Sequence, residues 1–478
     1  MSRRRFLFAV GAAAAGAPLI LSGCASDVLS GGAACGLPAR QADSRKRARI
    51  RAVFLYPPSK GFADDPNGWW SWPGTEFDAE GRQKLYVAEL EKMAGRLGVS
   101  VEVDSKSIAN LAEAKAVAEA VKTERPDGLL VIMFYNRSLK EADLLLKTAE
   151  AFDIPAIFYI GLGVKHGSVA KYRRPGVHLI QSLDNFEAIE YGLRMVNARK
   201  LLAQSRLLSI TNVKKVREDI EPFLGINVRT VPTATYVKTF KTMTLDDDAR
   251  RLIQSVTGRA DEVRVTREAL ANAARAHMAM RQMIAENGAH GVTMNCLRAG
   301  MLKPCMSFAL LNGQLFPAAC ENDKAAAYGL FLGEALTGRA GFQHNPAFET
   351  ERNHYYGSHC TCAPRLHGPD GPDSPHILRK FFHSNEGSCA IQTFWKPDEP
   401  VTMIHYYSGQ PASLDVYAGK VYKSHQAPPA GGCSTNVEIE ITDRKDAFAV
   451  KGHHNILFCG DFAQRFRQFA NLYKMKLV

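Results

Sequence analysis

The sequence lacks a complete glycine-rich loop for binding phosphates. Gly161-Leu162-Gly163 follows an expected strand, but no third glycine stands at the spacing of a dinucleotide-binding turn. The apolar stretch near the N-terminus, residues 8–21, is short and rich in alanine for a membrane span. Internal repeats are absent, and low-complexity sequence is confined to the N-terminal tail. The missing loop argues against an enzyme that uses nicotinamide or flavin.

The cysteines lack the CxxC pairs that are typical of structural zinc sites. Ten cysteines are present, but Cys360-Thr361-Cys362 is a CxC. If Cys24 carries a lipid, an odd number remains, and the sequence does not fix how they would pair in an oxidising compartment. We expect most of them to be small buried residues.

The body of the chain also lacks a strong charge of one sign. The formal net charge is +12 over 478 residues, and residues 1–50 contribute half of it, with eight Arg and Lys against Asp27 and Asp43. A nucleic-acid-binding face therefore has little support. The hydrophobic fraction of 46% is ordinary for a globular protein, and the length predicts about three domains.

The N-terminal segment resembles an export signal. Ser2-Arg3-Arg4-Arg5-Phe6-Leu7 is similar to the twin-arginine translocation motif, and Leu21-Ser22-Gly23-Cys24 is similar to a bacterial lipobox. Residues 1–24 are thus expected to be a signal and Cys24 the lipidated first residue; an ordinary signal peptide with an incidental cysteine is the alternative. We expect residues 25–49 to be a flexible basic linker, and its basic run would be attracted to anionic lipid headgroups. The protein would be periplasmic, with a lipid anchor as its only membrane contact.

From residue 50 the pattern alternates between apolar strands and amphipathic helices. Expected strands at 50–56, 99–103, 129–134, 156–160 and 177–181 are separated by expected helices at 79–97, 111–122 and 139–152. This series predicts a parallel, doubly wound α/β domain over residues 50–182. A second α/β domain is expected over 183–344, with helices at 185–203, 267–285 and 324–336. Residues 345–478 contain short apolar runs divided by Pro, Gly and Asp, which predicts a β-rich, mostly antiparallel third domain.

Three short motifs in the last third of the chain collect acidic residues and histidines. They are Cys320-Glu321-Asn322-Asp323, then Phe348-Glu349 leading to Gly357-Ser358-His359-Cys360, and finally Gly452-His453-His454 followed by Cys459-Gly460-Asp461-Phe462. Two carboxylates and two imidazoles suit one divalent metal site that folding assembles. Oxygen ligands mixed with imidazole favour Mn²⁺, Fe²⁺, Co²⁺ or Mg²⁺ over a thiolate zinc site.

These motifs resemble the L-fucose isomerase and L-arabinose isomerase family. The likeness covers roughly residues 50–478 in organisation, but only the C-terminal third carries specific motifs. In that family a Glu at a strand-to-helix turn before an Ala-rich helix binds the metal, as Glu321 would here. The resemblance implies that Glu349, His359 and His454 complete the ligand set, with Mn²⁺ as the expected ion, and that Glu321 and Glu349 are the acid and base.

Several assignments stay open. Glu351 competes with Glu349 for the role of second carboxylate, and His359 could contact the substrate instead of the metal. His453 is the second choice at the paired histidines. Trp70, His453 and Asn385 are candidate substrate contacts, Trp70 through ring stacking and Asn385 as part of a polar turn.

The resemblance implies an aldose–ketose isomerase that acts on a free monosaccharide through an enediol. It also implies a homo-oligomer in which a neighbouring N-terminal domain closes the sugar site. Export is unusual for such an enzyme, so two alternatives stand beside it. One is a sugar-binding or sensing lipoprotein on an isomerase fold, and the other is an epimerase or lyase for a modified sugar. A glycosidase would leave the histidines without a role.

Overall fold

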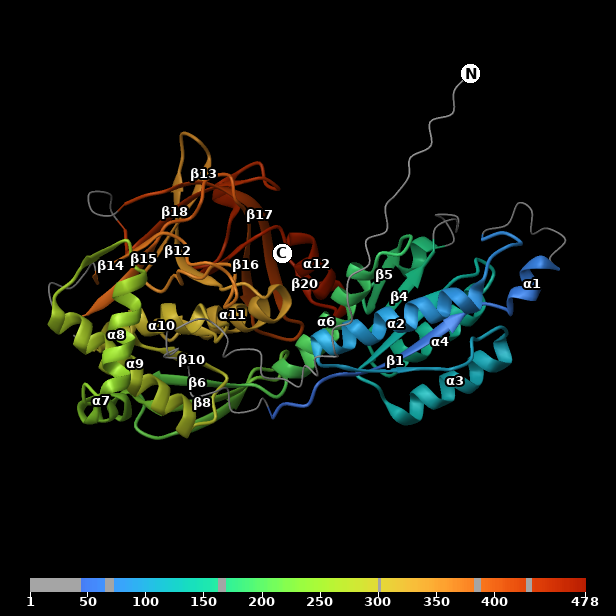
Figure 1. Ribbon diagram of the computed structural model, residues 1–478, viewed down its shortest axis with the longest axis horizontal. Helices are drawn as coiled ribbons and strands as arrows, with labels where there is room; N and C mark the ends of the chain where they lie inside the picture. The colour runs from blue at the N-terminus through green and yellow to red at the C-terminus, as the bar shows by residue number, and fades with distance from the viewer. Residues whose placement is uncertain (1–43, 65–72, 162–168, 300–301, 382–387, 427–431) are drawn as a thin grey trace, which may run out of the picture.

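The computed structural model describes residues 44–64, 73–161, 169–299, 302–381, 388–426 and 432–478 (Figure 1). The expected signal at 1–24 with Cys24, and the candidate substrate contacts Trp70 and Asn385, lie outside these residues. Within them, no helix combines the length and apolar character needed to cross a membrane. The described chain is a mixed α/β protein with two parallel-strand sheets and a closed antiparallel barrel.

The N-terminal domain is built on a five-stranded parallel sheet. Its strand order is β2 (Ser100–Val103), β1 (Arg49–Leu55), β3 (Gly128–Met133), β4 (Ala156–Ile160) and β5 (Val177–Gln181). The helices are α1 (Ser59–Ala63), α2 (Ala79–Leu97), α3 (Leu111–Glu124), α4 (Leu139–Ala151) and α6 (Phe186–Leu202). The expected βαβ series over this region is confirmed, and the predicted strand and helix bounds agree within two residues.

Both faces of this sheet are buried, which explains its nearly continuous apolar strands. On β1, Ile50 and Phe54 point into the core shared with α2 and α6, whereas Val53 and Leu55 point into the core shared with α3 and α4. Successive side chains of a strand face opposite sides of the sheet, so each strand serves two cores. Figure 1 shows this sheet with its helices as one lobe of the molecule.

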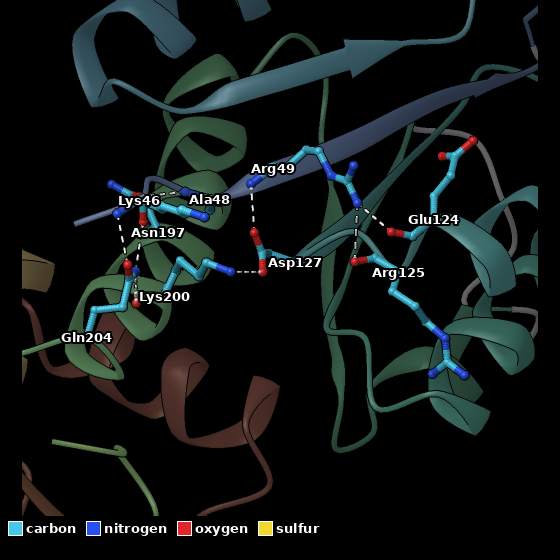
Figure 2. Close-up of polar contacts among 9 residues, drawn as sticks. All are labelled: Lys46, Ala48, Arg49, Glu124, Arg125, Asp127, Asn197, Lys200 and Gln204. Carbon is cyan, nitrogen blue, oxygen red and sulfur yellow. Dashed lines mark hydrogen bonds and ion pairs between the residues drawn. The ribbon is translucent and has the colours of Figure 1, made fainter. Parts of the chain in front are cut away.

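Residues 45–49 belong to the folded domain rather than to a flexible linker (Figure 2). The backbone N–H of Lys46 donates to Oε1 of Gln204 at 2.9 Å, and Nε2 of Gln204 donates back to the Lys46 carbonyl at 2.9 Å. The backbone N–H of Arg49 donates to Asp127, which also accepts from Lys200. The predicted boundary at residue 50 is therefore too late, because Gln204, just after α6, and Asn197, within α6, hold Lys46 and Ala48 before β1 begins.

The central domain contains a second five-stranded sheet. Its order is β11 (Ala318–Cys320), β10 (Gly291–Met294), β6 (Arg206–Thr211), β8 (Asn227–Pro232) and β7 (Arg217–Ile220), and only β7 at the edge is antiparallel. The expected helices are present as α9 (Arg267–Glu286) and α11 (Lys324–Thr337). The predicted series did not include α7 (Thr233–Thr242), α8 (Asp247–Arg259) and α10 (Cys305–Asn312).

The β-rich region closes into a six-stranded antiparallel barrel. Neighbouring strands around it are β16 (Pro400–Tyr407), β19 (Asn455–Cys459), β12 (Phe342–Glu349), β13 (His354–His359), β18 (Thr435–Ile441) and β17 (Ser413–Ser424), and β17 pairs with β16 to close the ring. The short strand β20 (Lys476–Leu477) pairs in parallel with the start of β17. A separate small sheet joins β15 (Cys389–Thr393) and β14 (His376–Lys380) to β9 (Glu262–Arg264) of the central domain. The prediction of an antiparallel domain is confirmed, but its closure was not foreseen.

Two helices hold the domains together. Helix α6 places Leu193 in the N-terminal core and Met195 in a second core, which it shares with α11 and the barrel strands β16 and β19. Helix α12 (Ala463–Leu472) follows the barrel and packs on β5, where the N–H of Gly176 donates to the carbonyl of Asn471. In Figure 1 the barrel lies over the central sheet, with α10 and α11 between them. The turn after β11 therefore faces the barrel.

A candidate metal centre between the central sheet and the barrel

The turn after β11 presents Glu321 to the barrel. Glu321 and Asn322 both adopt left-handed backbone conformations, with φ of 62° and 57°. Such residues persist only where the surroundings hold them. Here Ser209 Oγ donates to Oδ1 of Asn322 at 2.7 Å, and the Asn322 N–H donates to the carbonyl of Met294. Asp323 then caps α11 by accepting from the N–H of Ala326 at 2.9 Å.

Two buried histidines of the barrel meet Glu321 at this turn. Nε2 of His359, the last residue of β13, lies 3.5 Å from Oε1 of Glu321. Nε2 of His454, the residue before β19, lies 3.6 Å from Oε2. One donor atom from each of the three residues falls within 4.8 Å of the others. The structure thus brings together three of the four ligands that the sequence suggested.

The donor atoms fit a divalent metal ion. Nε2 of His359 and Nε2 of His454 are both buried, and apart from the Glu321 carboxylate at 3.5 Å and 3.6 Å neither has a polar partner among the described residues. Buried polar atoms rarely lack a partner, because removing such an atom from water without a new interaction is unfavourable. Ligand atoms held 2.1 Å from a tetrahedral ion are about 3.4 Å apart, close to the observed separations. One carboxylate and two imidazoles suit Mn²⁺, Fe²⁺, Co²⁺ or Zn²⁺.

Electrostatic interactions couple the three groups to one another. The nearby His359 lowers the pKa of Glu321, although partial burial opposes this. Burial alone would lower the pKa of His359, but its interaction with Glu321 and the surrounding negative groups raise it to about 9. Without an ion, the charged carboxylate and imidazolium stabilise each other, and an ion would replace that proton.

A second layer of residues orients the ligands, and the sequence did not reveal their roles. Nδ1 of His454 lies 2.7 Å from Oδ2 of Asp323, so the same carboxylate that caps α11 orients a metal-facing imidazole. Burial opposes ionisation of Asp323, but the hydrogen bond from His454 lowers its pKa overall. Gln343 of β12 accepts from the N–H of Cys320 at 2.6 Å and donates to its carbonyl at 3.3 Å. That side chain joins the barrel to the end of β11, immediately before Glu321.

Glu349 lies apart from this group, which corrects the expected ligand set. In the β12–β13 hairpin Glu349 pairs with His354, whereas Ser358, the neighbour of His359, pairs with Asn345. Four residues of antiparallel strand separate the two positions by about 14 Å. Glu349 instead accepts from the N–H of Arg352 at 2.8 Å. Glu351 is exposed in the same turn, so neither candidate supplies a second carboxylate to the centre in this chain.

The other candidates near the centre take different positions. His453 is exposed, and its ring centroid lies 4.3 Å from that of His454, at the rim of the site. Cys459, from the last motif, belongs to a separate group with His367 and Glu399 on the barrel. His367 and Glu399 are partly exposed, and their Nε2 and Oε1 atoms lie 3.2 Å apart.

Comparison with known proteins adds no assignment. No protein-family model matches this chain, and no curated protein sequence matches it significantly. The geometry of the site is therefore the basis for assigning a function.

Proposed function

We propose that the protein is a metal-dependent, isomerase-like enzyme that acts on a free monosaccharide at the centre formed by Glu321, His359 and His454. The observation that carries this proposal is the convergence of three donor atoms on one point, with two buried imidazole nitrogens that have no other partner among the described residues. The motif resemblance to the L-fucose and L-arabinose isomerases gives the reaction class and the expected Mn²⁺.

The three residues differ in the solvent exposure of their side chains, which gives them different roles in the proposed site. The side chains of His359 and His454 are 3% and 2% exposed, whereas that of Glu321 is 25% exposed. The histidines are therefore anchors, and Glu321 is the ligand that a substrate can reach. A bound divalent ion would act as a Lewis acid toward two adjacent sugar oxygens and stabilise enediolate charge.

A single carboxylate is sufficient for the proton transfer. Glu321 would take the proton from the carbon beside the carbonyl and return it to the former carbonyl carbon on the same face, while a hydroxyl proton moves between the two oxygens. This route replaces the expected pair of Glu321 and Glu349, because Glu349 lies about 14 Å along the strand from the site.

The test uses the full-length protein and a matched pair of variants. Glu321→Gln should lose bound Mn²⁺, measured by elemental analysis, whereas Glu349→Gln should keep it. Aldoses incubated in D₂O with the Mn²⁺-loaded protein should form ketoses, observed by NMR, and the fraction of deuterium at the carbon that receives the proton measures exchange of the Glu321 proton with solvent before its return. A protein that cannot be loaded with any divalent metal would overturn the proposal.

A second function is favoured by the position of Glu349. A protein that only binds a sugar through a chelating ion needs no acid or base, so it does not need Glu349 near the site. An exported sugar-binding or sensing lipoprotein is the alternative that the sequence offered. Metal-dependent binding of a sugar in calorimetry, without ketose formation or deuterium uptake from any aldose, would establish this function in place of the isomerase.

A further inference from the structure

Five cysteine thiols gather beside His359 and the end of β11. Cys360, which follows β13, interacts with three of them, and Sγ of Cys320 lies 2.8 Å from Sγ of Cys296. None of the described cysteines forms a disulfide. Four of the five are buried, and they come from separate segments of the central domain and the barrel: Cys296, Cys305, Cys320, Cys360 and Cys433.

His359 stands between this cluster and the candidate metal centre. Its Nε2 faces Glu321, and its Nδ1 lies 3.6 Å from Sγ of Cys360. A donor atom each from Cys320, His359 and Cys360 lies within 4.8 Å of the other two. One imidazole therefore presents its two nitrogens to two different groups of ligands.

We propose that Cys320, Cys360 and Nδ1 of His359 form a second metal site, which takes a thiophilic ion such as Zn²⁺ or Cu⁺. Sulfur ligands select these ions over Mn²⁺ and Mg²⁺. With metal–sulfur and metal–nitrogen distances of about 2.3 Å and 2.1 Å, neighbouring donors are about 3.6 Å apart. The observed separation of Cys360 and His359 matches this value. Cys296, whose Sγ lies 2.8 Å from that of Cys320, is a neighbouring thiol of the site.

This site differs in chemistry from the Glu321 centre and does not depend on the proposed reaction. Buried cysteines usually act as small apolar residues that fill the core. Packing alone does not account for a ring nitrogen 3.6 Å from one thiol, with a second thiol in the same group of donor atoms. The shared His359 makes the two sites adjacent. With an ion in the sulfur site alone, Nε2 of the ring would keep its proton and donate toward Glu321; with an ion in each site, that proton would pass to solvent and the ring would bridge them as imidazolate.

Cobalt titration of the full-length, reduced, metal-free protein tests the proposal, because Co²⁺ bound to sulfur shows an intense near-ultraviolet charge-transfer band. We expect one equivalent of this band, and we expect Cys360→Ser and Cys320→Ser to abolish it. Cys362→Ser is the matched control, since Cys362 is equally buried but packs in the barrel core. Glu321→Gln should retain the band while losing Mn²⁺ binding, measured by electron paramagnetic resonance.

The outcomes separate the two sites. Loss of the band in Cys360→Ser with unchanged Mn²⁺ binding supports a distinct sulfur site, and so does loss of both signals in His359→Ala. A band that persists in both Cys320→Ser and Cys360→Ser overturns the proposal, as does its absence from the unmodified protein. A mass lower by two hydrogens in protein isolated without reductant, with Cys296 and Cys320 linked in the peptide map, would also overturn it in favour of a disulfide. Near-ultraviolet circular dichroism checks that each variant is folded.

Discussion

The Oδ2 atom of Asp323 lies 2.7 Å from Nδ1 of His454, across 131 residues of sequence. This contact fixes the tautomer of His454, because Nδ1 must carry the proton that Asp323 accepts, which leaves Nε2 free to face Glu321. The same carboxylate caps α11. Asp323 therefore couples the start of the helix to the orientation of a proposed metal ligand.

Replacing Asp323 with Asn should separate these two roles. Asn still caps a helix, so stability should change little, but the loss of the charged partner should weaken metal binding by roughly 10–100-fold. Mn²⁺ affinity measured by electron paramagnetic resonance checks this prediction. Asp246→Asn is the matched control, since Asp246 caps α8 by the same contact, to the N–H of Ala249 at 2.9 Å, away from the site. Equal Mn²⁺ affinities in the two variants would contradict the orienting role.

Gly452 sets the path of the chain into His454. Its φ is +97°, and a Cβ atom there would lie 2.4 Å from Nδ1 of His405. Gly452→Ala should therefore destabilise the protein by on the order of 1–2 kcal/mol from its backbone conformation alone. It should also weaken Mn²⁺ binding, because relief of the clash displaces His454. Chemical denaturation and metal titration measure the two effects.

Gly95→Ala is the control for this change. Gly95 is in α2 with open space around it, so alanine should raise stability by up to about 1 kcal/mol and leave metal binding unchanged. Similar Mn²⁺ affinities in the Gly452 and Gly95 variants would show that the position of His454 does not depend on Gly452.

Buried His277 should make the protein sensitive to acid. Burial, with a smaller contribution from Arg281, lowers the pKa of His277 to about 3, and its Nδ1 lies 2.9 Å from Ser307 Oγ. Between pH 6.5 and about 3 the unfolded chain binds a proton at this residue that the folded chain does not. The free energy of unfolding therefore falls as the pH decreases through this range, by about 1.4 kcal/mol per pH unit for this group.

Urea denaturation at several pH values checks this prediction. His277→Gln should reduce the slope of the unfolding free energy against pH by about 1.4 kcal/mol per unit between pH 6 and pH 4. An unchanged slope would mean that His277 is protonated in the folded protein. Because the comparison concerns slopes, a general loss of stability in the variant does not affect it.

The segment before β1 should stabilise the N-terminal domain. A chain that begins at residue 50 loses the contacts of Lys46 with Gln204, of the Ala48 N–H with Asn197, and of the Arg49 N–H with Asp127 (Figure 2). At about 1 kcal/mol for each hydrogen bond, it should be less stable than a chain beginning at residue 44 by roughly 3–4 kcal/mol. Thermal unfolding of the two chains measures the difference, and identical midpoints would contradict it.

Local signals determined much of the N-terminal domain. The apolar runs of β4 and β5 and the periodicity of α2 gave bounds that the structure reproduces, because burial on both faces of a sheet and on one face of a helix leaves a direct pattern in the sequence. The motif around Glu321 also signalled a helix start, since Asp323 is a strong capping residue. These features depend on residues close together in the chain.

Tertiary structure alone decided the composition of the candidate centre. Glu349 and His359 are ten positions apart, yet the hairpin register directs them to different ends of β12 and β13, and no local pattern fixes that register. The hydrogen bonds of Asp323 with His454 and of Gln343 with Cys320 form only when the barrel packs on the central sheet. The chain by itself specified the residue types capable of holding a metal. Long-range strand pairing selected which of them meet, because pairing energy depends on partners distant in sequence.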